Sequence, residues 1–271
     1  MRLAVGIEYA GTRYAGWQRQ QHAPSIQAEV ERALASVADH PVAVTCAGRT
    51  DAGVHALAQV AHFDTEALRP LRGWLLGANT LLPPDIALQW VAEVAPDFHA
   101  RYTAQARTYR YLVLNRPLRA PLAHERVCTW RTPLDASRMQ AALEALVGEH
   151  DFSAFRGAEC QSRTPVRRML RISVVRAGEL VVFELSANAF LHHMVRNIVG
   201  SALLVGGGER DARWLAEVLA CRDRRAAGPT APAGGLYLAA VDYPAAAGVP
   251  RRAPVALSAM IGPSEGADGS G

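Results

Sequence analysis

The residues with the clearest capacity for chemistry lie in one short segment, residues 47–56, which reads Ala-Gly-Arg-Thr-Asp-Ala-Gly-Val-His-Ala. Its one carboxylate, Asp51, comes two residues after Arg49 and two before Gly53. An arginine at that spacing can hold a carboxylate ionised, and an ionised carboxylate can act as a nucleophile or a general base. Gly48 and Gly53 allow a positive φ or the close approach of a ligand. The segment therefore predicts a reactive loop, with a surface Asp-Ala-Gly turn as the plain alternative.

The elements around this loop follow strand and helix periodicities. The run 42–46 is apolar and β-branched, which predicts a buried strand. Asp51 therefore falls at a strand end, where rigid scaffolds usually hold reactive groups. Further strands are expected near 2–9, 57–64 and 86–95. Helices are expected from 26 to 37, after Ser25 as N-cap, and near 70–80.

The second half of the chain shows the same order of elements. Strands are expected near 107–115, 167–176, 180–187 and 236–241, and helices near 136–147, 190–205 and 211–220. Asp135 is the predicted N-cap of the first of these helices. Each half thus reads β-α-β-β-α-β, the ferredoxin-like order. We predict an α+β fold in which two such units, residues 1–105 and 106–244, form one long, mainly antiparallel sheet with a cleft where they meet.

Composition narrows the class of protein further. Half of the 271 residues are apolar and a fifth are charged, which is typical of a globular protein with a sizeable core. No apolar run approaches the roughly 20 residues that span a bilayer, and the N-terminus turns acidic before a signal-peptide core could form. We therefore expect a cytoplasmic protein. Residues 245–271 are rich in Ala, Pro, Gly and Ser, and we expect them to be disordered.

The cysteines and histidines show no metal-binding pattern. The four cysteines are far apart and form no Cys-x-x-Cys pair, so we expect reduced thiols and no structural zinc. His192 and His193 are adjacent, so on the helix expected there they would point about 100° apart and could not share a metal. We predict no metal site.

The charge favours a nucleic-acid partner without proving one. The formal net charge is +4 and all 29 basic residues are arginine. Guanidinium groups bind phosphate in a bidentate way and stack on bases, which suits RNA.

Five segments, in order along the chain, resemble the tRNA pseudouridine synthase A family. They are residues 16–20 (GWQRQ), 48–55 (GRTDAGVH), 98–101 (FHAR), 106–111 (ARTYRY) and 188–200 (NAFLHHMVRNIVG), and the likeness covers about residues 2–244. The resemblance implies an isomerase that converts uridine to pseudouridine at positions 38 to 40 of the tRNA anticodon stem-loop. It also implies a homodimer that needs no cofactor, with its active site in the cleft between the halves.

The same resemblance assigns roles to individual residues. It implies that Asp51 is the catalytic carboxylate and that Arg196 pairs with it. Arg49 would displace the target base and occupy the space it leaves, since a guanidinium is flat and cationic. Tyr109 would stack on the target uracil, and its hydroxyl would help to remove the C5 proton.

Other residues are predicted to contact RNA or line its groove. The expected contacts are Phe98, His99, Arg101 and Arg163, while Trp17 fits either the groove or the core. Two other functions remain open. One is a non-catalytic RNA-binding module, because RNA-recognition domains share the ferredoxin-like order, although their aromatic signature is not visible here. The other is a related synthase that modifies a different RNA.

Overall fold

The computed structural model describes residues 1–250, and the rest of the expected disordered tail lies outside the described residues. Residues 245–250, also expected to be disordered, instead include the short 3₁₀ turn Ala245–Ala247. Ala247 and Val249 pack against a small buried cluster that includes Phe98 and Tyr243. The apolar contact explains why this part of the tail departs from its composition-based prediction.

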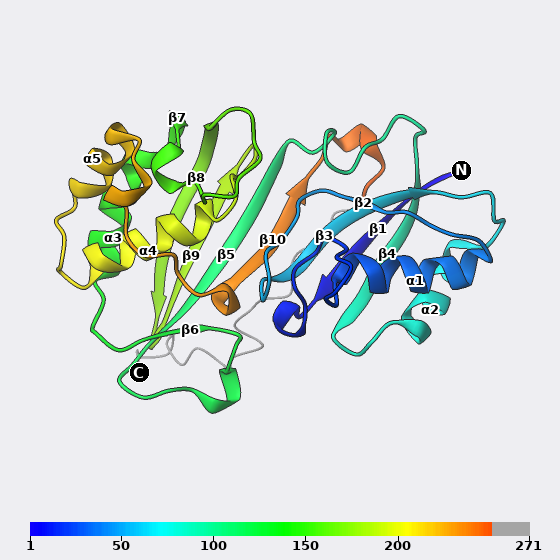
Figure 1. The fold of residues 1–271 in the computed structure, drawn as a ribbon, viewed down its shortest axis with the longest axis horizontal. Coiled ribbons are helices and arrows are strands. Elements are labelled where there is room, and N and C mark those ends of the chain that lie inside the picture. The colour runs from blue at the N-terminus through cyan, green and yellow to red at the C-terminus, as the bar shows by residue number, and fades with distance from the viewer. Residues whose placement is uncertain (251–271) are drawn as a thin grey trace, which may run out of the picture.

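The N-terminal half forms one end of a long mixed sheet (Figure 1). Its elements are β1 (Arg2–Tyr9), α1 (Ile26–Ala38), β2 (Thr45–Cys46), β3 (His55–Asp64), α2 (Leu71–Leu81) and β4 (Ile86–Val94). The strands lie in the order β4-β1-β3, with the short β2 on the far side of β3, and all pairs are antiparallel. β2 is shorter than predicted, although Val42 and Val44 before it are buried as expected.

The C-terminal half repeats this arrangement. Its main elements are β5 (Ala106–Asn115), α3 (Ala136–Leu143), β8 (Val166–Ala177), β9 (Leu180–Ala187), α4 (Met194–Gly206), α5 (Trp214–Cys221) and β10 (Leu236–Asp242). The short strands β6 (Cys128–Trp130) and β7 (Gly148–Asp151) pair with β5 and β8. Counted within this half, the strand order β10-β5-β9-β8 is fourth, first, third, second. The N-terminal strands β4-β1-β3-β2 lie in the same order, which confirms the predicted ferredoxin-like order in both halves. The division into domains at residue 105 stays a prediction.

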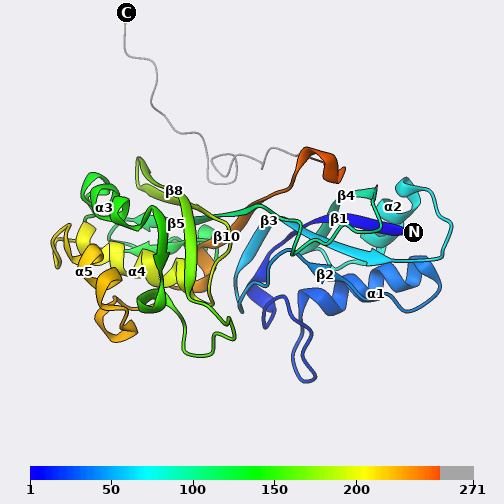
Figure 2. The ribbon, with the colours of Figure 1, turned by 90° about the horizontal axis from the view of Figure 1, so that it is seen from above.

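The two halves meet where β10 lies beside β3. These strands are parallel, but only His55 and Ala56 of β3 pair with β10. The other end of the same edge of β3 pairs with β2, at Ala61 and His62. The connection 47–54 between β2 and β3 therefore emerges at the seam between the halves. Figures 1 and 2 show α1 and α2 at one end of the molecule and α3 to α5 at the other.

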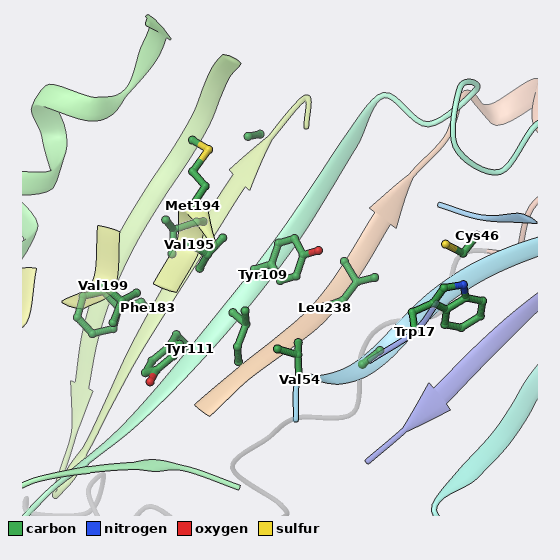
Figure 3. Packing of buried hydrophobic residues seen from close by; sticks show 14 of the residues in the cluster. Trp17, Cys46, Val54, Tyr109, Tyr111, Phe183, Met194, Val195, Val199 and Leu238 are labelled. Carbon is green, nitrogen blue, oxygen red and sulfur yellow. The ribbon is translucent and has the colours of Figure 1, made fainter. Parts of the chain in front are cut away.

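One hydrophobic core runs through both halves. Figure 3 shows its side chains from Phe183 through Tyr109 and Leu238 to Trp17, which is 1% exposed and therefore belongs to the core. The predicted N-caps are confirmed, since Ser25 accepts from Ala28 N and Asp135 from Arg138 N. Among residues 1–250, no helix is both long and apolar enough to cross a membrane.

Candidate active site

The loop 47–54 is fixed to the sheet on both of its sides. Ala47 N donates to Val60 O (2.7 Å), and the Gln59 side chain donates to Gly48 O (2.6 Å). Thr50 O accepts from a backbone N–H, and its hydroxyl lies 2.7 Å from the Tyr9 hydroxyl. The hydrogen-bonded backbone gives Asp51 a defined position. Positive φ at one glycine of this loop, Gly53 (76°), agrees with the prediction.

The Asp51 carboxylate faces three side chains from the C-terminal half. Arg196 Nη1 lies 3.6 Å from Asp51 Oδ2, and Arg196 Nε donates to Ala231 O (2.7 Å). His192 Nε2 lies 3.3 Å from Oδ1, and His193 Nε2 lies 3.5 Å from Oδ2. The Asp51 side chain is only 25% exposed, so its negative charge is balanced mainly by these groups. The predicted pairing of Arg196 with Asp51 is present in the structure.

The start of α4 explains how these side chains reach the carboxylate. α4 begins at Met194 and not near residue 190, because His193 has a left-handed backbone (φ 59°) and serves as N-cap. Such a conformation is uncommon for a residue with a Cβ and costs free energy. Met194, Val195 and Ile198 are buried on the core side of the helix, while Arg196 faces the loop.

The expectation that His192 and His193 lie on the helix and point about 100° apart was wrong, because both residues precede α4. Their rings stack with centroids 3.8 Å apart and an interplanar angle of 26°. With Asp51 they form a set whose ligand atoms all lie within 4.8 Å of one another, so a metal ion is one possible occupant. These two histidines are the site residues that the sequence reasoning missed, although they belong to the quoted motif.

Arg49 does not pair with Asp51 among the described ion pairs. Its side chain is exposed on the same loop. The charge partner of Asp51 is therefore Arg196, which leaves the Arg49 guanidinium available to solvent or to RNA.

Tyr109 on β5 lies at the same seam. Its ring is 8% exposed and packs edge-on against Phe190, with centroids 5.0 Å apart. It lies beside the loop, since a Cβ on Gly48 would be 3.9 Å from the Tyr109 hydroxyl, an ordinary contact distance. Burial, and secondly the nearby Asp51 charge, raise the pKa of Tyr109 above its usual value. Tyr111 is instead fully buried, and its hydroxyl donates to Pro232 O (2.7 Å).

The four expected RNA contacts have different environments. Phe98 is only 3% exposed and packs against Tyr243, which argues against direct contact of its ring with RNA. His99 is half-buried, with its Nδ1 accepting from two backbone N–H groups. Arg101 and Arg163 are exposed. Phe98 therefore anchors its loop in the core, and its contact with RNA stays a prediction.

Arg107 joins the segments around the site and was also missed. Its guanidinium donates to four backbone carbonyls, those of Ala47, Arg101, Ala104 and Asn188. Ala47 begins the Asp51 loop and Asn188 begins the segment that leads to the two histidines. The side chain is 8% exposed, and burial lowers its pKa. It therefore ties the Asp51 loop to the groups that face Asp51.

A doubled ferredoxin-like sheet with one arginine-paired aspartate on a loop at the seam defines a protein of the pseudouridine synthase fold. The model of the tRNA pseudouridine synthase family matches residues 6–103 and 142–244. The chain is 59% identical to tRNA pseudouridine synthase A of Methylococcus capsulatus, over 93% of each chain. It is 55% identical to the Aeromonas hydrophila protein of that name, also over 93% of each. The chain belongs to the tRNA pseudouridine synthase family.

Proposed function

We propose that this protein converts uridine to pseudouridine at positions 38 to 40 of the tRNA anticodon stem-loop, without a cofactor. The observation that carries the proposal is the juxtaposition of Asp51, its cation Arg196 and the ring of Tyr109 at one seam. These groups come from both halves of the chain, so the seam is where a flipped nucleotide would meet all three.

The reaction is an isomerisation in which the bond from uracil N1 to ribose C1′ breaks and a bond from C5 to C1′ forms. Asp51 supplies the carboxylate that acts at C1′, as nucleophile or as base. Arg196 pairs with that carboxylate and balances its charge. Tyr109 stacks on the uracil that must rotate before C5 can bond, and its hydroxyl serves the removal of the C5 proton. The hydrogen lost from C5 balances the one gained at N1, so no electrons are exchanged.

Exposed cations are proposed to bind the tRNA. The target base must leave its helix to reach Asp51, and Arg49 would fill the space that it vacates. Arg101, Arg163 and the half-buried His99 are proposed to contact the RNA backbone. The proposal includes a homodimer in the cytoplasm, in which one subunit holds the body of the tRNA while the other modifies the anticodon arm.

The decisive experiment maps pseudouridines in tRNA from cells that lack this protein. Positions 38 to 40 should lose the modification, and a copy of the wild-type gene should restore it. A gene carrying Asp51→Asn should not restore it, although the variant protein accumulates normally. Unchanged modification in all tRNAs would refute the proposal, and losses confined to another RNA would assign the chain to a different substrate.

A further inference from the structure

Each oxygen of the Asp51 carboxylate has one histidine ring beside it. His192 Nε2 faces Oδ1 at 3.3 Å, and His193 Nε2 faces Oδ2 at 3.5 Å. The rings are stacked, and the Nε2 atoms of both face the one carboxylate. Two parallel N–H groups match the two oxygens of one carboxylate, as the fork of an arginine does.

The surroundings of His192 decide which of its nitrogens carries hydrogen. Its Nδ1 is buried and has no hydrogen-bond partner among residues 1–250. Gly157 closes off this side, because a Cβ there would lie 2.9 Å from Nδ1, and its own N–H donates to His192 O (2.8 Å). A hydrogen on Nδ1 would be buried without an acceptor, which is costly. Hydrogen on Nε2 instead places a donor, and not a lone pair, 3.3 Å from Asp51 Oδ1.

His193 is suited to the same task. Burial lowers its pKa, which the nearby Asp51 charge opposes and the charges of His192 and Arg196 reinforce. The side chain is 31% exposed, so it is reached by solvent on one side and by Asp51 on the other. Hydrogen on Nε2 of a neutral ring would place a donor 3.5 Å from Asp51 Oδ2 without adding a second positive charge beside Arg196.

The same geometry disfavours a metal ion. An ion bound by two imidazoles must lie in the plane of each ring, along the lone pair of its nitrogen. Rings stacked 3.8 Å apart at 26° have nearly parallel planes, and such planes do not meet at a point close to both nitrogens. The Arg196 guanidinium, 3.6 Å from the same carboxylate, also repels a cation.

We propose that His192 and His193 are positioning residues that fix the plane of the Asp51 carboxylate by donating one N–H to each of its oxygens. The inference rests on the proposed function, because it is the reaction at C1′ that requires an oriented carboxylate. Arg196 supplies the charge and the histidine pair supplies the orientation. Misplacement of a reacting group lowers the rate of the chemical step more than it lowers substrate affinity.

The test compares glutamine and leucine at each position, because glutamine retains an N–H donor near Nε2 and leucine does not. At His193 both replacements carry the same left-handed backbone strain, so the comparison cancels it. His124, which is 77% exposed, provides the control with the same two substitutions. Single-turnover conversion of tRNA and tRNA affinity are measured for each variant.

The leucine variants should react roughly ten- to a hundredfold more slowly, the loss of one hydrogen bond to a charged group, with tRNA affinity nearly unchanged. Glutamine should restore most of the rate, and neither change at His124 should matter. Leucine variants as fast as the wild type would overturn the proposal. Equal losses with leucine and glutamine would also overturn it, because they would indicate packing alone. A wild-type protein inactive on tRNA would instead count against the proposed function.

A second measurement does not depend on activity. Nitrogen-15 NMR of the histidines in the free protein should find hydrogen on Nε2 in both rings, and Asp51→Asn should shift both signals. Hydrogen on Nδ1 of His192 would overturn the proposal. Addition of Co²⁺ should give no tetrahedral absorption band, and a band abolished by His192→Leu would show that the rings are metal ligands.

Discussion

Replacing Arg107 by lysine should weaken both the fold and the catalytic site. The guanidinium donates to carbonyls of three separate segments, at 2.9 Å to Ala47 O, 2.9 Å to Asn188 O and 3.2 Å to Ala104 O, as well as to Arg101 O. Among residues 1–250 it forms no ion pair, so these carbonyl dipoles are what solvate its charge. A lysine has three donors on one atom, whereas the arginine spreads its donors over a rigid fork.

The expected loss of stability follows from the number of carbonyl acceptors that lysine would leave without a donor. A hydrogen bond to a charged group contributes about 1.5–3 kcal/mol. If the ammonium reaches two of the four carbonyls, the free energy of unfolding should fall by about 3 kcal/mol or more. The rate of pseudouridine formation should fall as well, because Ala47 and Asn188 begin the segments that carry Asp51 and its partners.

Urea unfolding gives the stability, and single-turnover conversion of tRNA gives the rate. Arg110→Lys is the matched control, since Arg110 lies on the same strand and pairs with Glu184 (2.8 Å) in a partly exposed position. Such a pair contributes about 1 kcal/mol or less. If Arg107→Lys cost no more than Arg110→Lys and left the rate unchanged, the linking role of Arg107 would be refuted.

The remaining predictions concern chemistry, pH and RNA binding. Asp51→Asn should abolish turnover while folding and tRNA affinity stay near wild type, because Asn keeps the shape but cannot act at C1′. Turnover within about tenfold of wild type would exclude Asp51 as the catalytic carboxylate. Tyr109→Phe should keep base stacking and slow a late proton transfer, whereas Tyr109→Ala should also weaken capture of the base, as rates and binding assays can separate. Burial lowers the pKa of His62 from 6.5 to about 4, so its neutral ring stabilises the fold above pH 6.5. The free energy of unfolding should therefore fall by roughly 1–3 kcal/mol as the pH falls to 4. His62→Asn should remove this pH dependence in urea unfolding. Light scattering should find a dimer, and tRNA affinity should fall steeply with salt as counterions are released; a fully active monomer or a flat salt series would contradict these two claims.

Local sequence patterns were sufficient to predict the main strands and helices. Period-two and helical spacing located the main strands and helices, and the side-chain oxygens of Ser25 and Asp135 marked two helix starts. The doubled sheet followed from the repeated order of elements. The reactive loop could be identified from Asp51 and its glycines, because a strand end and a turn are local features.

The partners of Asp51 could not be derived in the same way. The histidine pair depends on the left-handed backbone of His193. This conformation prevents α4 from extending back toward residue 190, and the two rings stack. Arg107 binds backbone carbonyls, which carry no side-chain signal in the sequence. Arg196 was linked to Asp51 only by family resemblance, and Arg49, the nearer arginine in sequence, proved not to be the ion-pair partner.

The short pairing between β3 and β10 is what leaves space for the site. Only two residues of β3, His55 and Ala56, pair with β10. A longer ladder would require β10 to follow the edge of β3 past the point where the loop 47–54 emerges, and would cover Asp51. Two hydrogen-bonded positions alone hold the halves weakly, so side chains must complete the seam. His55 does so where β3 begins, with Nδ1 accepting from Gly11 N and Nε2 within 2.9 Å of Glu125 O. Arg107 does so beside the loop, which is why the geometry around Asp51 should be most sensitive to residues that never contact the substrate.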